Sequence, residues 1–347
     1  MRCHRATHAY SRMCRSFLFA FVLSLNSILT LHAWDYEGHR IVNELAVDAL
    51  PNDFPAFAKT PEARERIAFL GGEPDRWRNS ANLAFKHCHA PEHYIDLDDL
   101  SHYGMTQAQL TPFRYDFAVT MGEGRIKHPE HFSPIDPAKN TDHTRELLGF
   151  LPWTINDHFA TLESGFSYLK ALEEAGTREE IANARQNIIY MMGLLSHFVG
   201  DAAQPLHTTK HFNGWIGSNP HNYRTNRTIH GWIDGGFIRL AEIKHRDLKS
   251  KIRPARALWA QSPTNAFGEA LKFINEQHAL VEKVYIMDRD GALTQRDPKS
   301  AQGREFIGGQ LVKGGQFLSD LWYSAWRHAP TDKFLIGELK KRNAKVE

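Results

Sequence analysis

The sequence contains little cysteine, with three among its 347 residues. Two of them, Cys3 and Cys14, lie in an N-terminal segment that we expect to be removed, which would leave Cys88 alone in the mature chain. A chain with one cysteine forms no intramolecular disulfide, so it does not belong to the small secreted proteins that depend on disulfides. A chain of about 300 residues buries enough apolar surface to fold without such links.

Long apolar runs are absent except at the N-terminus. Residues 1–15 carry arginines but no acidic residue, residues 16–31 are almost wholly apolar, and the small Ala33 follows. This order is typical of a secretory signal peptide, and the apolar run is short for a membrane span. We predict that residues 1–33 are a signal peptide cleaved before Trp34, and that the mature chain is exported to the periplasm or beyond without stable membrane insertion. An uncleaved anchor is the alternative.

A strong charge of either sign is also absent. The full chain has 42 basic and 40 acidic residues, and the predicted cleavage removes four arginines, which leaves 38 basic residues against 40 acidic ones. A mature chain with a net charge near −2 has no overall positive field to attract nucleic acid. Binding of a polyanion would therefore need a local cationic site such as bound metal.

Strand signals are weak throughout, and the sequence shows no repeat or low-complexity tract. Apolar residues at helical spacing predict helices over residues 38–50, 157–175, 270–287 and 306–326. Thr177 and Glu180 form a capping-box pattern, which predicts a long helix ending near Asp201, before Pro205.

These patterns predict an all-α protein, a helical bundle in a single domain over residues 34–347. Two stretches without clear helical periodicity, 97–152 and 208–228, are predicted to be long loops that lie over the bundle. Loops of that length in a compact domain usually shape a binding site.

A series of histidines and aspartates carries the main chemical signal. Its core is His197-x-x-x-Asp201, then His207, then His230-x-x-x-Asp234. A histidine and an aspartate four residues apart on a helix project from the same face, so each pair can offer two ligands to one cation. The first pair interrupts an apolar helix, where an unpaired carboxylate would cost on the order of several kcal/mol. Bound metal is therefore the favoured explanation, and two pairs indicate more than one ion.

Further ligand candidates lie upstream at His39, Asp75 and His93, although spacing alone gives each little weight. The triplet formed by residues 87–89, His-Cys-His, could imitate a thiolate zinc site, but alternate residues on a short segment rarely converge without two more ligands. The other histidines considered are expected in loops or at the surface: His131, His143, His158, His211 and His221.

In combination, the motifs resemble the single-strand-specific zinc nucleases of fungi and plants, which share a superfamily with bacterial zinc phospholipase C. The matching segments are Trp34 with Gly38-His39, Asp75 with Arg78, His93-Tyr94-Ile95-Asp96, the stretch from Ser196 to His207, and His230 with Asp234. Near the C-terminus, Gly314-Gly315-Gln316-Phe317-Leu318 also looks like the closing helix of that family.

The resemblance implies three Zn²⁺ ions in a cleft beneath the loops. The implied ligands are Asp75, His93, His197 and Asp201 for one ion, His207, His230 and Asp234 for a second, and the Trp34 amine and carbonyl with His39 and the second oxygen of Asp201 for a third. The Trp34 amine exists only after cleavage, so the precursor is expected to be inactive.

The resemblance also implies a reaction, in which clustered dications activate water for in-line attack on phosphorus. By similarity, Arg78 would bind the phosphate and stabilise the transition state, because its planar fork matches phosphate geometry. Asp96 would orient the attacking water. A surface salt bridge for Arg78 and a helix cap for Asp96 are the alternatives.

The loop between the two metal motifs departs from the family. A Gly-Gly-Asn segment that shapes the family's base pocket is replaced by residues 210–220, and Thr228-Ile229 stands in place of Asn-Leu. The aromatics Phe212, Trp215 and Tyr223 could stack unpaired bases, or could equally hold the loop against the bundle.

The predicted function is hydrolysis of single-stranded RNA and DNA, and of 3′-nucleotides, by an exported, monomeric zinc phosphodiesterase. A zinc phospholipase C acting on lipid headgroups is the alternative, and a secreted metal-binding protein without turnover is the third. The gap from His207 to His230, and Asp rather than Glu at position 234, favour the nuclease branch.

Overall fold

Helices are the only regular elements in the part of the chain that the computed structural model describes, namely residues 34–259, 266–297 and 299–345. The predicted all-α class is therefore confirmed for these ranges. The predicted signal peptide, residues 1–33, lies outside them. Within them, no helix is both long enough and apolar enough to cross a membrane.

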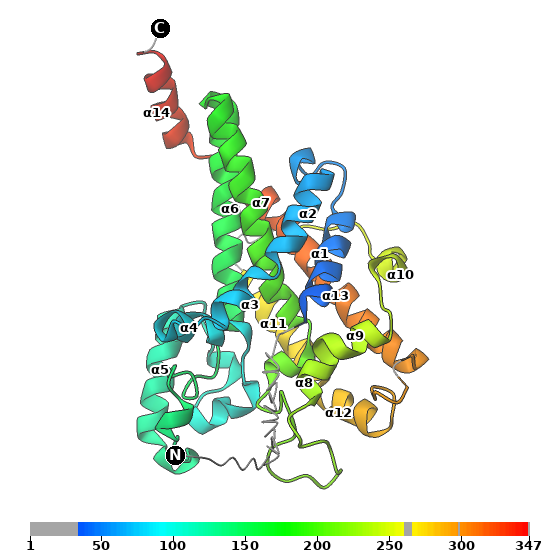
Figure 1. The fold of residues 1–347 in the computed structure, drawn as a ribbon. Coiled ribbons are helices and arrows are strands. Elements are labelled where there is room, and N and C mark those ends of the chain that lie inside the picture. Colours follow the sequence, from blue (N-terminus) through cyan, green and yellow to red (C-terminus); the bar gives the residue numbers. More distant parts are fainter. Residues whose placement is uncertain (1–33, 260–265, 298, 346–347) are drawn as a thin grey trace, which may run out of the picture. The chain divides into compact units, whose positions relative to one another are not determined.

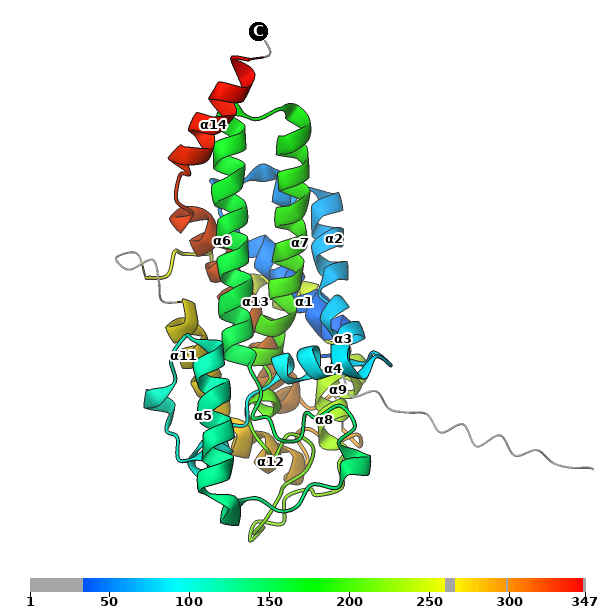
Figure 2. The ribbon, with the colours of Figure 1, turned by 90° about the vertical axis from the view of Figure 1, so that its left-hand side faces the viewer.

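Two long helices, α6 (Leu151–Ala175) and α7 (Arg178–Ala202), pack side by side along their length (Figures 1 and 2). The third long helix, α13 (Ala301–His328), packs against both of them and against α1 (Tyr36–Ala49). Helix α2 (Pro61–Leu70) covers α7 and α1. This group of helices buries the apolar core and carries the candidate site at one end of α7.

The start of α7 follows from its local sequence. The Thr177 hydroxyl accepts a hydrogen bond from the Glu180 backbone N–H at 3.2 Å, and the Glu180 carboxylate accepts one from the Thr177 N–H at 2.8 Å. These two bonds satisfy donors that a helix start otherwise leaves unpaired. The helix then ends at Ala202, before Pro205. The predicted helix is confirmed at both ends.

The Gly314-Gly315 pair brings α13 close to its neighbours. A Cβ at Gly314 would lie 2.9 Å from the Cβ of Ala203, and one at Gly315 would lie 2.8 Å from the Cβ of Leu45. Real Cβ atoms do not approach so closely, and glycine at these two positions lets α13 pack tightly against α1 and the end of α7.

Three predicted helices have wrong boundaries, and one of them, predicted over 306–326, runs from Ala301 to His328. The helix predicted over 270–287 is two helices, α11 (Ala266–His278) and α12 (Val281–Arg289), because the Leu280 N–H bonds back to the Gln277 carbonyl at 2.9 Å in a tighter turn. The helix predicted from residue 157 begins at Leu151 instead. Pro152 lies in its first turn, where the missing N–H costs nothing.

The stretch 97–152 is not a simple loop. It contains α5 (Arg114–Lys127), which packs on the 3₁₀ helix η3 (Leu97–Tyr103). The stretch 209–228, by contrast, has no helix and remains a loop. The other short helices are α3 (Glu73–Arg78), α4 (Leu83–His89), α8 (Ile229–Gly231), α9 (Phe237–Leu240), α10 (His245–Leu248), α14 (Lys333–Asn343), the 3₁₀ helices η1 (Ala56–Lys59), η2 (Ala90–His93), η4 (Gln107–Gln109), η5 (Pro129–His131), η6 (Pro137–Lys139), η7 (Pro205–Thr208) and η9 (Lys249–Lys251), and the π-helix η8 (Trp232–Gly236).

The described residues belong to one compact unit, Leu31–Glu347.

Candidate metal centre

The last turn of α7 supplies the middle of the site. His197 and Asp201 project from it one turn apart, both fully buried, with His197 Nε2 3.3 Å from Asp201 Oδ2. The other ring nitrogen of His197, Nδ1, lies 2.7 Å from the Gly71 carbonyl. A proton on Nδ1 would donate to that carbonyl, which leaves the Nε2 lone pair directed at the site, as in most metal-binding histidines.

Two further residues join this pair from the region before α5. His93, in η2, places Nδ1 2.9 Å from both Asp201 Oδ2 and His197 Nε2. Asp75, in α3, places Oδ1 3.9 Å from His197 Nε2. Ligands 2.0–2.1 Å from a tetrahedral ion lie about 3.3–3.4 Å apart, so these separations are close to those of ligands around a shared cation.

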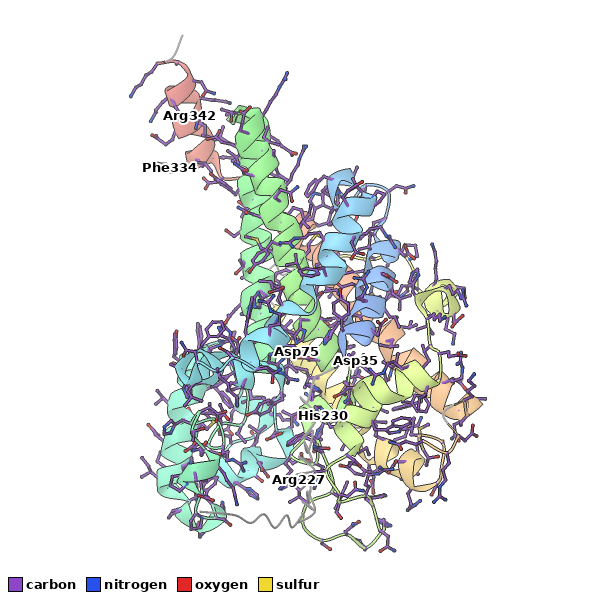
Figure 3. The ribbon with its side chains drawn as sticks, viewed as in Figure 1. Asp35, Asp75, Arg227, His230, Phe334 and Arg342 are labelled. Atoms are coloured by element: carbon purple, nitrogen blue, oxygen red, sulfur yellow. The ribbon has the colours of Figure 1, made fainter. Side chains whose placement is uncertain are left out.

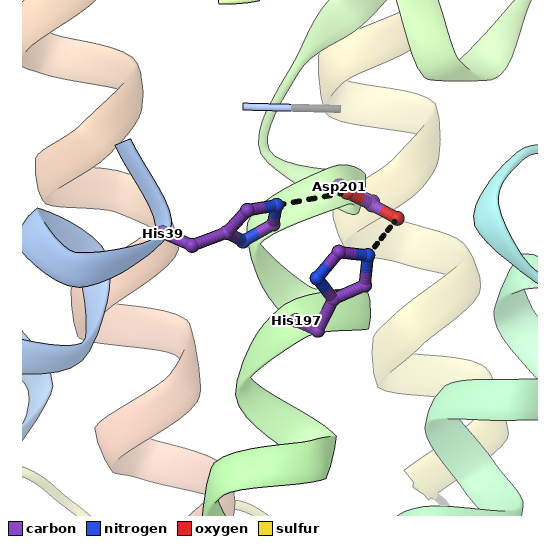
Figure 4. A group of neighbouring side chains, drawn as sticks. All are labelled: His39, His197 and Asp201. Atoms are coloured by element: carbon purple, nitrogen blue, oxygen red, sulfur yellow. Dashed lines mark ion pairs between the residues drawn. The ribbon is translucent and has the colours of Figure 1, made fainter. Parts of the chain in front are cut away.

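His39, from α1, approaches the opposite oxygen of Asp201 (Figure 4). Its Nε2 lies 3.5 Å from Asp201 Oδ1, and its ring stacks on that of His197 with centroids 4.1 Å apart. Gly200 makes room for it, because a Cβ there would lie 2.6 Å from His39 Nδ1. Asp201 thus presents one oxygen to His93 and His197 and the other to His39, which suits a carboxylate that bridges two ions.

The remaining group lies around η7, α8 and η8. His230 Nε2 is 3.0 Å from His207 Nε2 and 3.3 Å from Asp234 Oδ2. His207 Nδ1 lies 2.6 Å from the His93 carbonyl, and Gln204 donates to Asp234 Oδ1 at 2.7 Å. Figure 3 labels His230 and, on α3, Asp75. Asp234 lies in the π-helix, a rare element that is frequent at functional sites.

The N-terminal end of α1 lies beside this last group. The Asp35 backbone N–H donates to the Asp234 carbonyl at 3.0 Å, and Arg239 forms an ion pair with Asp35. Trp34, the residue before it, is fully buried. The start of the predicted mature chain is therefore tied to Asp234.

Taken as groups, the buried side chains could hold several metal ions. The sets whose ligand atoms converge within 4.8 Å are His39, His197 and Asp201; Asp75, His93 and His197; and His207, His230 and Asp234. Together, the three sets contain all eight of the predicted side-chain ligands.

Several ligand atoms are buried without a hydrogen-bond partner in the protein. They are Nε2 of His39, Oδ1 of Asp201 and Oδ2 of Asp234, each of which faces another residue of the site. Each unsatisfied buried polar atom costs about 1–3 kcal/mol, and such atoms are rare outside functional sites. A bound cation would satisfy them, so the donor set fits metal.

Electrostatics favour the same conclusion. Burial lowers the pKa of His39 and of His93 to about 3, which keeps both rings neutral and able to bind metal at pH 7. Burial raises the pKa of Asp234 well above its usual value. For Asp201, burial opposes ionisation, but His197 and His207 outweigh it and hold the pKa well below the usual value. A buried carboxylate such as Asp234 ionises readily only beside added positive charge.

Arg78 lies directly beside the ligands. Its Nε is 2.7 Å from Asp75 Oδ1, and its side chain is only 12% exposed. Burial alone would raise the pKa of Asp75, but the charges of Arg78 and of the neighbouring histidines together outweigh burial and lower the pKa to about 2. The ion pair predicted as the alternative role is present, although it is largely buried rather than at the surface.

Asp96 is a half-buried residue at the start of η3. Burial, and then the like charges of Asp99 and Asp98, raise its pKa well above the usual value. It is the N-cap residue of η3, but its side chain makes no capping hydrogen bond, so the predicted alternative role as a helix cap is wrong. Its backbone N–H donates to the Leu148 carbonyl at 2.7 Å.

The three aromatics proposed to stack bases have different surroundings. Phe212 is 42% exposed, and its ring meets His230 edge to face with centroids 5.6 Å apart. Trp215 stacks on His211 at 4.1 Å, and the Tyr223 hydroxyl donates to Glu282 at 2.8 Å. Trp215 and Tyr223 therefore hold the loop in place, which leaves Phe212 as the aromatic that adjoins the metal ligands.

Of the histidines predicted in loops or at the surface, His211 does lie in a loop, where it is buried, whereas His158 lies on a helix. His211 is buried beneath Trp215 and accepts a hydrogen bond at Nδ1 from the Ile216 N–H at 3.0 Å. His158 belongs to α6, where its ring stacks on Phe198 with centroids 5.0 Å apart. His158 falls within the helix predicted over 157–175, and its contact with Phe198 places it against α7 rather than in solvent.

The His-Cys-His triplet of α4 does not converge. His87 Nδ1 is 2.9 Å from the Asp142 carbonyl, His89 Nδ1 is 2.9 Å from Glu92, and Cys88 is exposed.

One positioning residue was missed in the sequence. Gln204 lies between Asp201 and His207 in the sequence, is fully buried, and orients Asp234 through its hydrogen bond. The sequence signal that could have indicated this role was a polar amide side chain in an apolar segment, directly before Pro205.

No family model matches the chain, and a search of curated proteins finds no match.

Proposed function

We propose that the chain is an exported, zinc-dependent phosphodiesterase that hydrolyses single-stranded RNA and DNA and also accepts 3′-nucleotides. The observation that carries this proposal is Asp201, whose two oxygens face different groups of buried histidines, with a guanidinium at the edge of the same cluster. Adjacent cation sites linked by a carboxylate suit a phosphate ester, which has several oxygens to neutralise at once.

The ligand sets divide among three ions in this proposal. Asp75, His93, His197 and Asp201 would hold one, and His207, His230 and Asp234 a second. His39, the other oxygen of Asp201 and the backbone of Trp34 would hold the third. When bound, such ions supply a nucleophilic water at neutral pH and neutralise the charge on phosphate and on the leaving oxygen.

The residues of the chain would bind and orient the substrate. Arg78 is held at the ligand cluster through Asp75, a position from which its guanidinium could donate hydrogen bonds to a phosphate. Phe212 offers an exposed ring beside His230, on which a base next to the scissile phosphate could stack. Asp96 would orient the attacking water, the role that the resemblance implies for it.

Export is part of the proposal. Residues 1–33 supply the signal pattern, and the hydrogen bond from Asp35 to Asp234 supports the role of Trp34, because it holds the new N-terminus beside the ligands. We propose that the mature enzyme acts as a monomer.

A phospholipase C is the second candidate, and one surface feature favours it. Helix α5 exposes Tyr115, Val119 and Ile126, at 83%, 62% and 82%, with spacings of four and seven residues that place them on one face. Phe113, at the start of α5, is 66% exposed. An apolar face of this kind could lie on a lipid surface.

A substrate panel tests the proposal. The processed protein would be incubated with single-stranded RNA, single-stranded DNA, duplex DNA, a 3′-nucleotide and phosphatidylcholine vesicles, each with chelator and after zinc is restored. Zinc-restored cleavage of the single strands, lost in His207→Ala and retained in His221→Ala, is the expected result.

Other outcomes have a clear meaning. Release of phosphocholine with intact nucleic acid would replace the proposal with the lipid alternative. Retained zinc with no turnover on any substrate would instead identify a metal-binding protein without enzymatic activity.

A further inference from the structure

A second cluster of possible metal-binding side chains lies at the end of α5, on elements separate from those that form the buried centre. His128, Glu130 and His131 bring their ligand atoms within 4.8 Å of one another. Glu130 Oε1 is the common neighbour, 3.7 Å from His128 Nδ1 and 3.8 Å from His131 Nε2. The side chains are 39%, 63% and 40% exposed in sequence order, so solvent and ions reach them.

The backbone beneath this group is well braced. The His128 N–H closes the last turn of α5 on Gly124 at 2.9 Å, and the His131 N–H donates to the His128 carbonyl at 3.1 Å. Phe132, which follows, packs edge to face on Tyr103 at 4.7 Å and lies 4.3 Å beneath the guanidinium of Arg125. The two histidines are therefore held at a fixed separation rather than on a loose loop.

The ring of His131 is oriented as a ligand would be. Its Nδ1 lies 3.0 Å from the His102 carbonyl, to which a proton on Nδ1 would donate. That proton leaves the lone pair on Nε2, the atom that faces Glu130. The His128 and His131 rings lie nearly parallel, 11° apart, with centroids 5.6 Å from each other.

Two features of the surroundings favour a cation here. The group lies at the C-terminus of α5, a helix of 14 residues, where the helix dipole and unpaired carbonyls attract positive charge. The two separations between histidine nitrogen and Glu130 oxygen, 3.7 and 3.8 Å, are about 0.4 Å longer than the edge of a tetrahedral zinc site, a gap that half-exposed side chains can close by small rotations.

We propose that His128, Glu130 and His131 bind one divalent first-row transition cation of the zinc class. Two imidazoles and a carboxylate suit such a cation better than Mg²⁺ or Ca²⁺, which prefer oxygen ligands. Three protein ligands leave the fourth position to water or to an incoming group. The bound cation links η5 to the end of α5 and exchanges readily with solvent, unlike an ion in the buried centre.

The test uses zinc as the probe on the full processed chain. Protein loaded with zinc would be desalted into a weak chelator to clear the exposed site, and then titrated with ZnCl₂ by calorimetry while total metal is measured. One additional equivalent should bind to the wild type and to His221→Ala, an exposed histidine outside the group, and none to the His128→Ala/His131→Ala double variant. Glu130→Gln should weaken that binding by about tenfold or more.

Equal isotherms and equal zinc content in the wild type, the double variant and Glu130→Gln would overturn the proposal. Circular dichroism checks that each variant is folded. If the double variant unfolds, Glu130→Gln still tests the proposal, because it changes a single exposed side chain. The readout is stoichiometry rather than turnover, so the result does not depend on the proposed phosphodiesterase activity.

Discussion

The buried centre and the α5 group use the same ligand types in opposite surroundings. In the centre, His39, Asp201 and Asp234 have site-facing polar atoms that are buried without a hydrogen-bond partner in the protein. At the end of α5, water reaches the same kinds of atom on His128 and His131. Burial therefore leaves the polar atoms of the first region to be satisfied by a cation, whereas water can satisfy those of the second. The comparison teaches that metal affinity depends on what else could satisfy the ligands.

The largest effect should come from Asp201→Ala, which removes the carboxylate facing two ligand groups. We expect loss of zinc from the buried centre and a fall in kcat/KM of about a thousandfold or more, because the ions together provide several kcal/mol of transition-state stabilisation. Metal analysis and kinetics on a single-stranded substrate measure both. Glu130→Gln is the matched control and should keep full turnover. Equal losses in the two variants would contradict the contrast between the two regions.

The second-largest effect should be on how the free energy of unfolding depends on pH. In the metal-free protein the pKa of His39 and of His93 is lowered to about 3, whereas in the unfolded chain histidines titrate near the ordinary value of about 6.5. Between those values the unfolded state binds more protons, so stability falls as the pH falls from about 6.5 towards 3. Each such histidine contributes a slope of about 1.4 kcal/mol per pH unit.

Urea unfolding of chelator-treated protein at pH 7 and pH 5 measures this slope. His39→Phe should reduce this slope. An equal slope in the wild type and in His39→Phe would contradict the burial argument for the centre, because Asp96 and Asp234, whose raised pKa gives the opposite slope, are common to both proteins.

A smaller effect is expected at Phe212, the aromatic next to His230. Phe212→Ala should raise KM for single-stranded substrates by about five- to a hundredfold, since stacking a base on an aromatic ring contributes about 1–3 kcal/mol. Phe212→Tyr, which keeps the ring, should retain most of the affinity. If Phe212→Ala binds substrate normally, base stacking must occur elsewhere.

The smallest change should come from the far end of α7. Thr177→Ala removes the N-cap and should cost about 1 kcal/mol of stability without altering zinc content in either region. Thermal unfolding with parallel metal analysis checks it, and Thr177→Ser serves as the conservative control. Loss of zinc on this substitution would mean that the helix transmits distortion along its whole length.

Short sequence signals were enough to predict the helices whose ends are set by neighbouring residues. The capping box at Thr177 and the proline at 205 set the ends of α7, and the spacing of four residues placed His197 and Asp201 on one face. The break between α11 and α12, by contrast, follows from a turn at Leu280 that periodicity does not reveal.

The upstream ligands needed more than spacing. His39 and His93 were individually weak candidates, because contacts between distant segments bring them to Asp201. The group at the end of α5 was overlooked because the stretch containing it was predicted to be a loop. Once a helix ends at His128, the 3₁₀ turn that follows directs His131 back towards it.

The sequence separation of the ligands has a consequence for how the centre assembles. His197 and Asp201 share one turn of α7 and can meet a cation as soon as that turn forms. His39 joins them only after the chain closes from position 39 to position 201, which is a slow, non-local step. If the centre holds metal as proposed, we therefore expect the folding chain to capture its first ion on α7 early, and the remaining ligands to close around an ion that is already in place.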